Sequence, residues 1–342
     1  MKKQKILLGI GLLAMIILVV GIGGRLKRAQ PDRGTMRIVY NVQSLNYGVI
    51  MAAYEKGLFG KYNLSVELVP LKSGKEIRQA IASGQAEIAL TNAVNFLVLN
   101  DLGAPVKMLF PCTISNTIVL VRPDGEIEKL ADLKGKKVYG TLGQSEFVLV
   151  KALKEQGIMD SDFEFVDIEK DYRGIALLQQ KIIDAVPTNI YNEGSLEELG
   201  AVRLKEWEEG GYSKQTWPAT FVGVNTNYLS EHADRVEMFI DVMIEAQLFI
   251  RDNQQEAAEL VARHINKGTL GVANFSADRV LGSWQEGVKY TMWYDTGVLT
   301  EMAEFIFAGG QIKNNIPLDQ MFDFRFVDKI KSAQDEIYGP TI

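Results

Sequence analysis

The chain has 342 residues, of which 47% are hydrophobic and 23% are charged, and its formal net charge is −6. A single hydrophobic core stops growing at roughly 250 to 300 residues, so two domains are expected. Outside the first 28 residues the acidic sequence has no basic block, which excludes a nucleic-acid binder because such proteins need cations to neutralise phosphates.

The first thirty residues contain an apolar segment flanked by basic residues. Residues 6–24 carry no charge, follow three lysines, and precede Arg25, Lys27 and Arg28. The length of this run lies between that of a signal-peptide core and that of a membrane span, which needs about 20 residues. We therefore predict residues 1–30 to be a signal peptide or an N-terminal membrane anchor, which places the protein outside the cytoplasm. Both forms stay open.

The first half of the chain alternates short β-branched runs with segments of helical periodicity. The runs predicted as strands are 36–42, 64–69, 87–90, 106–110 and 118–121. The helices predicted between them are 47–56, 74–83 and 93–99. This alternation is typical of a parallel sheet with crossover helices.

A second α/β region repeats the pattern, and the end of the chain is then predicted to be helical throughout. The second set of strands is 136–139, 163–168, 183–186 and 201–204, with helices at 145–156 and 172–180, and a strand at 220–224 is predicted to return the chain to the first lobe. From residue 230 onward the predicted helices are 233–252, 254–266, 277–292 and 300–307, followed by a cluster at 317–331. The predicted fold class is α/β with two lobes: 36–121 plus 222–342 form lobe 1, and 122–221 form lobe 2.

Several blocks in this order resemble a known family. They are 55–59 (EKGLF), 62–69 (YNLSVELV), 80–88 (AIASGQAEI), 130–138 (LADLKGKKV), 177–185 and 224–258. Together they resemble ABC-transporter solute-binding proteins of the nitrate, sulfonate, taurine and thiamine-precursor type, over about residues 36–264. The chain departs from that pattern at Asn63, Glu87 and the pair Thr91 and Asn92.

The resemblance implies a type II periplasmic-binding fold, in which two lobes joined by hinge strands, here 118–121 and 220–224, close on a ligand. It implies a monomer that delivers a small molecule to the permease and ATPase subunits of an ABC importer, with membrane contact through the N-terminal segment. It implies neither a cofactor nor a nucleic-acid partner. Two alternatives stay open: an enzyme of the same fold, of the menaquinone-pathway lyase or thiamine-pyrimidine synthase type, or a ligand-sensing ectodomain.

Catalytic and metal-binding patterns are missing from the sequence. It has no GxSxG, HExxH or GxxxxGK[ST] motif. Cys112 is the only cysteine, and His232 and His264 lack a second ligand at metal-binding spacing, so we read both histidines as structural. No enzyme activity, cofactor or metal is therefore expected.

The candidate ligand site lies in the loops that follow the strands, because open α/β sheets bind ligands beyond the carboxyl ends of their strands. The candidate ligand-binding residues are Ser44, Asn46, Tyr47, Thr91, Asn92, Ser115, Asn116, Gly143, Gln144, Ser145, Glu146, Asn189, Tyr191 and Trp217. Most of them are neutral hydrogen-bonding residues, and Glu146 is the one charge among them. Turn and cap roles would explain many of the same residue types.

The candidate loops contain no Arg, Lys or His, so an anionic head group would be held by backbone amides at helix N-termini. The starts after Gly143 and Asn92 are the candidates. We expect a small organic anionic or zwitterionic solute of the sulfonate, taurine or pyrimidine class. Glu146 either complements its own helix start or faces an amino group of the ligand.

Overall fold

A computed structural model describes residues 34–42, 44–140, 143–166, 174–189, 200–267, 275–293 and 296–339. The predicted signal peptide or anchor at residues 1–30 and the candidate Tyr191 lie outside these ranges. Among the helices in the described ranges, none combines the length and apolarity that a membrane crossing requires.

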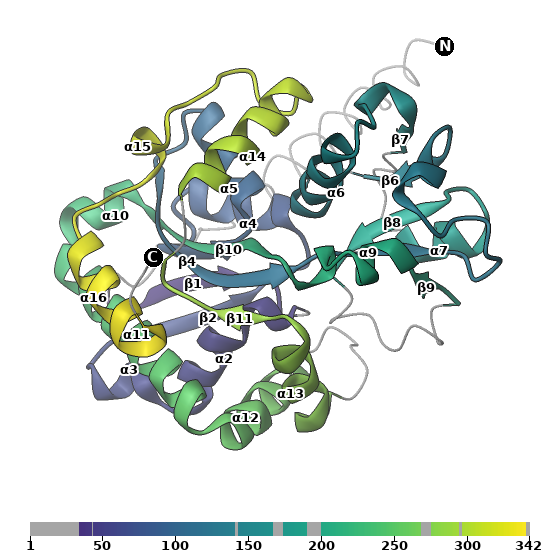
Figure 1. The fold of residues 1–342 in the computed structure, drawn as a ribbon. Helices are drawn as coiled ribbons and strands as arrows, with labels where there is room; N and C mark the ends of the chain where they lie inside the picture. Colours follow the sequence, from purple (N-terminus) through teal and green to yellow (C-terminus); the bar gives the residue numbers. More distant parts are fainter. Residues whose placement is uncertain are drawn as a thin grey trace, which may run out of the picture. The chain divides into compact units, whose positions relative to one another are not determined.

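The first sheet has, in the described residues, six strands in the order β11-β4-β10-β3-β1-β2 (Figure 1). β1 pairs in parallel with β2 and β3, whereas β10 runs antiparallel to β3 and β4. The bounds are β1 Met36–Tyr40, β2 Val66–Pro70, β3 Ile88–Thr91, β4 Val106–Asn116, β10 Thr216–Asn225 and β11 Lys289–Tyr290. The parallel pairing brings the carboxyl ends of β1 and β3 to one edge of the sheet.

The second sheet has the order β7-β6-β8-β5-β9. Its bounds are β5 Ile118–Val121, β6 Lys137–Tyr139, β7 Glu164–Val166, β8 Ala185–Thr188 and β9 Val202–Arg203. The chain passes from β4 to β5 at Thr117 and returns to the first sheet at β10. The chain therefore changes sheets at Thr117 and at the start of β10, a few residues before the predicted lobe boundaries after residues 121 and 221. Which residues move together as each lobe stays a prediction.

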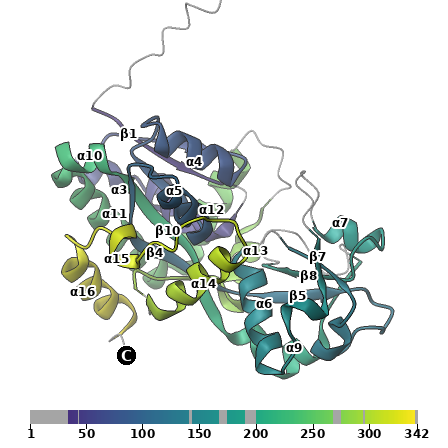
Figure 2. The same cartoon turned by 90° about the horizontal axis from the view of Figure 1, so that it is seen from above.

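Helices cover both faces of the first sheet (Figures 1 and 2). One face carries α2 Gly48–Glu55, α11 Ala233–Asp252, α12 Gln254–Lys267, α13 Ala277–Glu286 and α16 Val327–Tyr338. The other carries α4 Gly74–Ala82, α5 Ala93–Asp101, α14 Thr296–Ala308 and α15 Leu318–Met321. Strands buried on both faces read as continuous apolar runs, and all four residues of β3 are buried.

The second sheet is covered by shorter helices. They are α6 Gln144–Glu155 and α9 Lys205–Glu209 on one face and α7 Gly174–Gln179 on the other. Two short helices complete the first lobe, α3 Leu58–Lys61 and α10 Thr226–Glu231. Each buried Leu, Ile or Phe in these layers contributes about 1.5–3 kcal/mol, which is why the interlayer packing dominates the stability of such a fold.

Most predicted elements are confirmed, and the helix predicted at 233–252 coincides with α11. The prediction that everything after residue 230 is helical is wrong. The helix predicted at 277–292 ends at Glu286, and β11 follows, with Lys289 opposite Ile114 and Tyr290 opposite Thr113. The reason lies in the tertiary structure, because β4 continues to Asn116, beyond its predicted end at residue 110. The backbone of this extension forms hydrogen bonds with residues 289–290, and the side-chain periodicity of a sequence contains no information about such a partner strand.

A buried polar group ties the first sheet to α2 and α12. The Tyr40 hydroxyl lies 2.7 Å from Nε2 of His264, whose Nδ1 lies 3.0 Å from a carboxylate oxygen of Glu55. Lys267 donates to the other oxygen of Glu55 at 2.7 Å. Burial lowers the pKa of His264, so a neutral ring is favoured in the folded protein.

Candidate functional site

Neutral side chains meet at the carboxyl ends of the central strands of the first sheet. We call Asn46, Tyr47, Thr91, Thr113 and Thr220 the strand-end cluster. Thr113 Oγ1 donates to the Asn46 carbonyl at 2.7 Å and contacts the Thr220 hydroxyl. Tyr47 and Thr91 share a side-chain hydrogen bond, and burial raises the pKa of Tyr47. Every member is uncharged near pH 7, so a ligand at this cluster would be held by hydrogen bonds and ring contact.

A tyrosine side chain of β11 fixes the backbone of this site through a hydrogen bond. The Tyr290 hydroxyl donates to the Leu45 carbonyl at 3.2 Å and accepts from Trp284 Nε1 at 2.9 Å. Gly48 permits this approach, since a Cβ there would overlap the Tyr290 hydroxyl. Two successive carbonyls, those of Leu45 and Asn46, are thus fixed by side-chain hydroxyls, which orients the short helix η1 Leu45–Tyr47.

Three candidate residues carry buried polar atoms that find no hydrogen-bond partner among the described residues: Asn46 Oδ1, Asn189 Oδ1 and Trp217 Nε1. Such an atom costs roughly 1–3 kcal/mol, and native proteins keep few of them. Trp217 lies opposite Ser115 in the ladder between β10 and β4. Asn189 follows Thr188, which pairs with Ile118, so it lies beside the crossing at Thr117. The set offers acceptors and a donor that a bound solute would satisfy.

The two predicted helix starts are already capped by their own side chains. Gly143 N donates to Glu146 Oε2 at 2.9 Å, and Asn95 N donates to Asn92 Oδ1 at 2.9 Å. Glu146 is only 5% exposed, so its charge faces the positive end of α6 from inside the protein. An anion at this terminus would compete with that carboxylate. The contact matches the first of the two predicted roles of Glu146, complementing its own helix start.

The remaining candidates have varied surroundings. Asn116 Nδ2 donates to the Ser213 carbonyl at 2.7 Å and to the Glu286 carbonyl at 3.2 Å, so it ties together segments at the crossing. Ser44 caps η1 by accepting from Asn46 N at 3.3 Å. Gln144 and Ser145 lie half-buried in the first turn of α6.

Sequence reasoning missed Thr113, Thr220 and Tyr290. The two threonines lie inside strands that are longer than predicted, so they were not counted among residues that follow strands. Tyr290 fell in the incorrectly predicted helix. The β-branched composition of residues 112–121 was the available signal for the longer strand.

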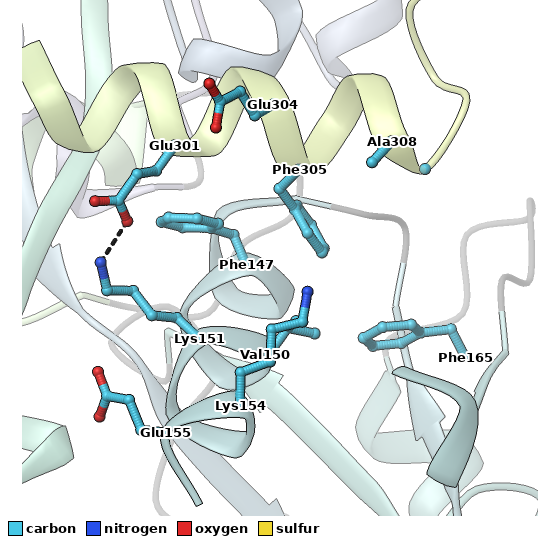
Figure 3. Close-up of a pocket in the computed structure, with 11 residues that line it drawn as sticks. Phe147, Val150, Lys151, Lys154, Glu155, Phe165, Glu301, Glu304, Phe305 and Ala308 are labelled. Atoms are coloured by element: carbon cyan, nitrogen blue, oxygen red, sulfur yellow. Dashed lines mark hydrogen bonds and ion pairs between the residues drawn. The ribbon is translucent and has the colours of Figure 1, made fainter. Parts of the chain in front are cut away.

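A pocket of about 770 Å³ opens between α6 and α14 (Figure 3). Its apolar wall includes Phe147, whose ring centroid lies 5.7 Å from that of Phe305 and 5.8 Å from that of Trp217. Lys151 of α6 forms an ion pair with Glu301 of α14. Phe147 thus links the pocket lining to the candidate Trp217, which is not itself part of the lining. A ring contact and an ion pair join α6, which covers the second sheet, to α14, which covers the first.

Cys112 lies beside the cluster, with its sulfur 3.0 Å from the Thr220 hydroxyl. Burial raises the pKa of its thiol to about 11, so the reactive thiolate is scarce at neutral pH. We expect iodoacetamide to leave Cys112 unmodified in the folded protein and to modify it fully in denaturant, as mass spectrometry of the intact chain would show. Rapid modification of the folded protein would contradict this burial.

A family model with the description NMT1/THI5 like matches residues 44–257, more than half of the chain and the stretch that includes nearly all of the site. The chain belongs to the NMT1/THI5-like family. A protein of Haemophilus influenzae whose name refers to thiamine biosynthesis is 29% identical over 179 residues, which are 52% of each protein. The chain thus spans about half of the length of this curated relative.

Solved structures of low sequence identity share the fold of this NMT1/THI5-like protein. The periplasmic aliphatic sulphonate binding protein SsuA from Escherichia coli aligns with a TM-score of 0.66 at 17% identity, over 85% of this chain and 92% of that chain. The desulfurization enzyme DSZB aligns with a TM-score of 0.58 at 16% identity, over 86% and 98%. The predicted two-lobed α/β periplasmic-binding fold is confirmed. This fold serves binding proteins and enzymes alike, so the fold alone does not decide the activity.

Proposed function

We propose that this NMT1/THI5-like protein is an extracytoplasmic solute-binding protein that delivers a small organic solute to an ABC importer and catalyses no reaction. The observation that carries the proposal is the strand-end cluster: uncharged hydrogen-bonding groups gathered where open α/β sheets bind ligands, beside buried polar atoms that lack partners. The permease and ATPase subunits are the partners, and residues 1–30 supply export or membrane contact.

The proposed solute is small and carries both a hydrogen-bond donor and an acceptor. Asn46 Oδ1 needs a donor and Trp217 Nε1 needs an acceptor. The capping of α6 by Glu146 disfavours a purely anionic ligand there, and the unsatisfied acceptor of Asn46 favours a ligand that carries an N–H donor. Within the classes considered, this supports taurine-like zwitterions and amino-substituted pyrimidines over a bare oxyanion. Tyr47 and Trp217 supply aromatic surface for the organic part.

A thermal-shift screen over sulfonates, taurine and pyrimidines tests the binding function. A true solute at a hundred times its Kd should stabilise the folded protein by about 2.7 kcal/mol, because it binds only the native state. Each hit would be repeated on the Asn46→Ala variant, for which we expect a smaller shift. A screen without hits, together with turnover of a sulfinate by the protein, would favour an enzyme of this fold.

We further propose that the segment between the two crossings moves against the first sheet when solute binds. Two crossings join the sheets, one at Thr117 and one at the start of β10, and the pocket between α6 and α14 leaves room for closure. Small-angle scattering should show a smaller radius of gyration with saturating solute. Scattering curves that stay superimposable under saturation would contradict a hinge.

A further inference from the structure

A second pocket lies outside the strand-end cluster, beside the edge strand β11. It has a volume of about 360 Å³, and α11, α12, α13 and α16 contribute to its lining, so we call it the edge pocket. This volume lies within the range of roughly 300 to 1,000 Å³ that is typical of small-molecule sites. The proposed solute site does not use it, so it can bind a different molecule.

The charged side chains that line the edge pocket are cationic. They are Lys289 of β11 and Arg251 of α11, and the lining residues that the structure describes include no carboxylate. Arg251 is already compensated, since its Nε lies 2.7 Å from Asp252 and its Nη1 donates to the Ile337 carbonyl at 3.4 Å. Lys289 is exposed and forms no ion pair within the described part of the chain. The pocket therefore offers one uncompensated ammonium group to a ligand.

Three aromatic rings and the aliphatic side chains of Ile114, Ile250 and Val288 line the edge pocket, and the polar atoms of the rings are occupied. Trp284 and Tyr290 meet edge to face with their centroids 5.7 Å apart, and their polar atoms bond to each other. Tyr338 donates its hydroxyl proton to Gln247 Oε1 at 2.9 Å, which holds this third ring in place. What remains open to a ligand is ring surface, which favours a flat apolar or aromatic body. Gln254 adds one amide at the lining.

We propose that the edge pocket is a second binding site, for a small aromatic carboxylate. The ring of the ligand packs against the three aromatic side chains, and its carboxylate pairs with the Lys289 ammonium. The assignment goes beyond the solute-binding function, because it rests on β11, α13 and α16 and on none of the strand-end side chains. Trp284 and Tyr290 line this pocket, and Tyr290 also donates to the Leu45 carbonyl, so the two sites are neighbours without sharing a ligand contact.

Titration of the full chain with benzoate tests the assignment, with isothermal calorimetry and ligand-observed NMR as the readouts. We expect benzoate to bind, benzyl alcohol to bind more weakly because it lacks the charge, and Lys289→Gln to weaken benzoate binding about two- to fivefold, the range of an exposed ion pair. Lys75→Gln is the matched control, because Lys75 is an exposed lysine of α4, a helix on the opposite face of the first sheet. It should leave benzoate binding unchanged.

Two further results separate this site from the solute site. The Asn46→Ala variant should bind benzoate as tightly as the unmodified protein. Benzoate binding that is lost in Asn46→Ala and kept in Lys289→Gln would place benzoate at the strand-end cluster and overturn the proposal. An absence of benzoate binding would also overturn it, while a solute found by the thermal-shift screen would leave the proposed function standing.

Discussion

Replacing Asn46 with alanine is expected to weaken solute binding by about ten- to a hundredfold, the range of one lost hydrogen bond to a charged ligand group. The carbonyl of Asn46 is fixed by Thr113, and its buried side-chain oxygen has no partner in the part of the chain that the structure describes. The substitution removes that oxygen and leaves the backbone contacts in place. Calorimetry with a solute from the screen would measure the change, and an unchanged Kd would remove Asn46 from the site.

The two buried tryptophans, Trp207 and Trp217, provide a matched pair of variants that tests whether an unpartnered polar atom contacts the solute. Trp217→Phe removes an indole N–H that is unpartnered within the described ranges, so we expect weaker solute binding with little loss of stability. Trp207→Phe removes an N–H that donates to the Thr117 carbonyl at 2.9 Å. It should lower the free energy of unfolding by about 1–3 kcal/mol and leave the affinity unchanged. If both variants lost affinity equally, the effect would be structural rather than a ligand contact.

Replacing His264 with phenylalanine is expected to lower the free energy of unfolding by about 2–4 kcal/mol, since buried groups of Tyr40 and Glu55 then lose partners. The ring volume is retained, so the cost is mainly polar. Urea denaturation at pH 7.5 would measure it, with His232→Phe as the control that changes the other histidine. A loss as small as that of the control would show that the contacts of His264 contribute little.

The same variant should change the pH dependence of stability. Burial lowers the folded-state pKa of His264 from its ordinary 6.5, so the unfolded chain binds more protons as the pH falls. The stability that His264 contributes is therefore complete above pH 6.5 and decreases as the pH falls through the lower folded-state pKa. His264→Phe should lose stability less steeply than the unmodified protein between about pH 6.5 and 5. If the stability of the two proteins changed with pH in parallel over this range, the titration of His264 would not be the cause of the pH dependence.

Glu55 adds a second loss of stability at lower pH. Its burial alone would raise the pKa, but hydrogen bonds from Lys267 and His264 outweigh burial and hold the pKa below 4.5. The stability from this carboxylate is present above pH 4.5 and is lost as the pH falls further. Stability measured down to pH 3 should therefore decrease in two steps in the unmodified protein, with the His264 step first.

The strand-end residues show which parts of the site local patterns can reveal. Asn46, Thr91, Asn189 and Trp217 were predicted because they follow or flank apolar β-branched runs, and that signal is local. The structure places a hydrogen-bond network or an unpartnered buried atom at each of them. The contacts of Thr113 with the Asn46 carbonyl and with Thr220 depend on the antiparallel register of β4 and β10, about a hundred residues apart in sequence. No local pattern encodes that register.

By itself the sequence determined the α/β alternation, the family blocks and the uncharged character of the strand-end loops, because side-chain periodicity and composition are local properties. Tertiary structure alone decided that residues 289–290 form an edge strand, that Glu146 caps α6 from a buried position, and that Tyr290 reaches the Leu45 carbonyl over Gly48. The physical reason is common to all three. Burial and backbone pairing between distant segments outweigh local preferences of about 1 kcal/mol per residue, so the outcome depends on which segments meet.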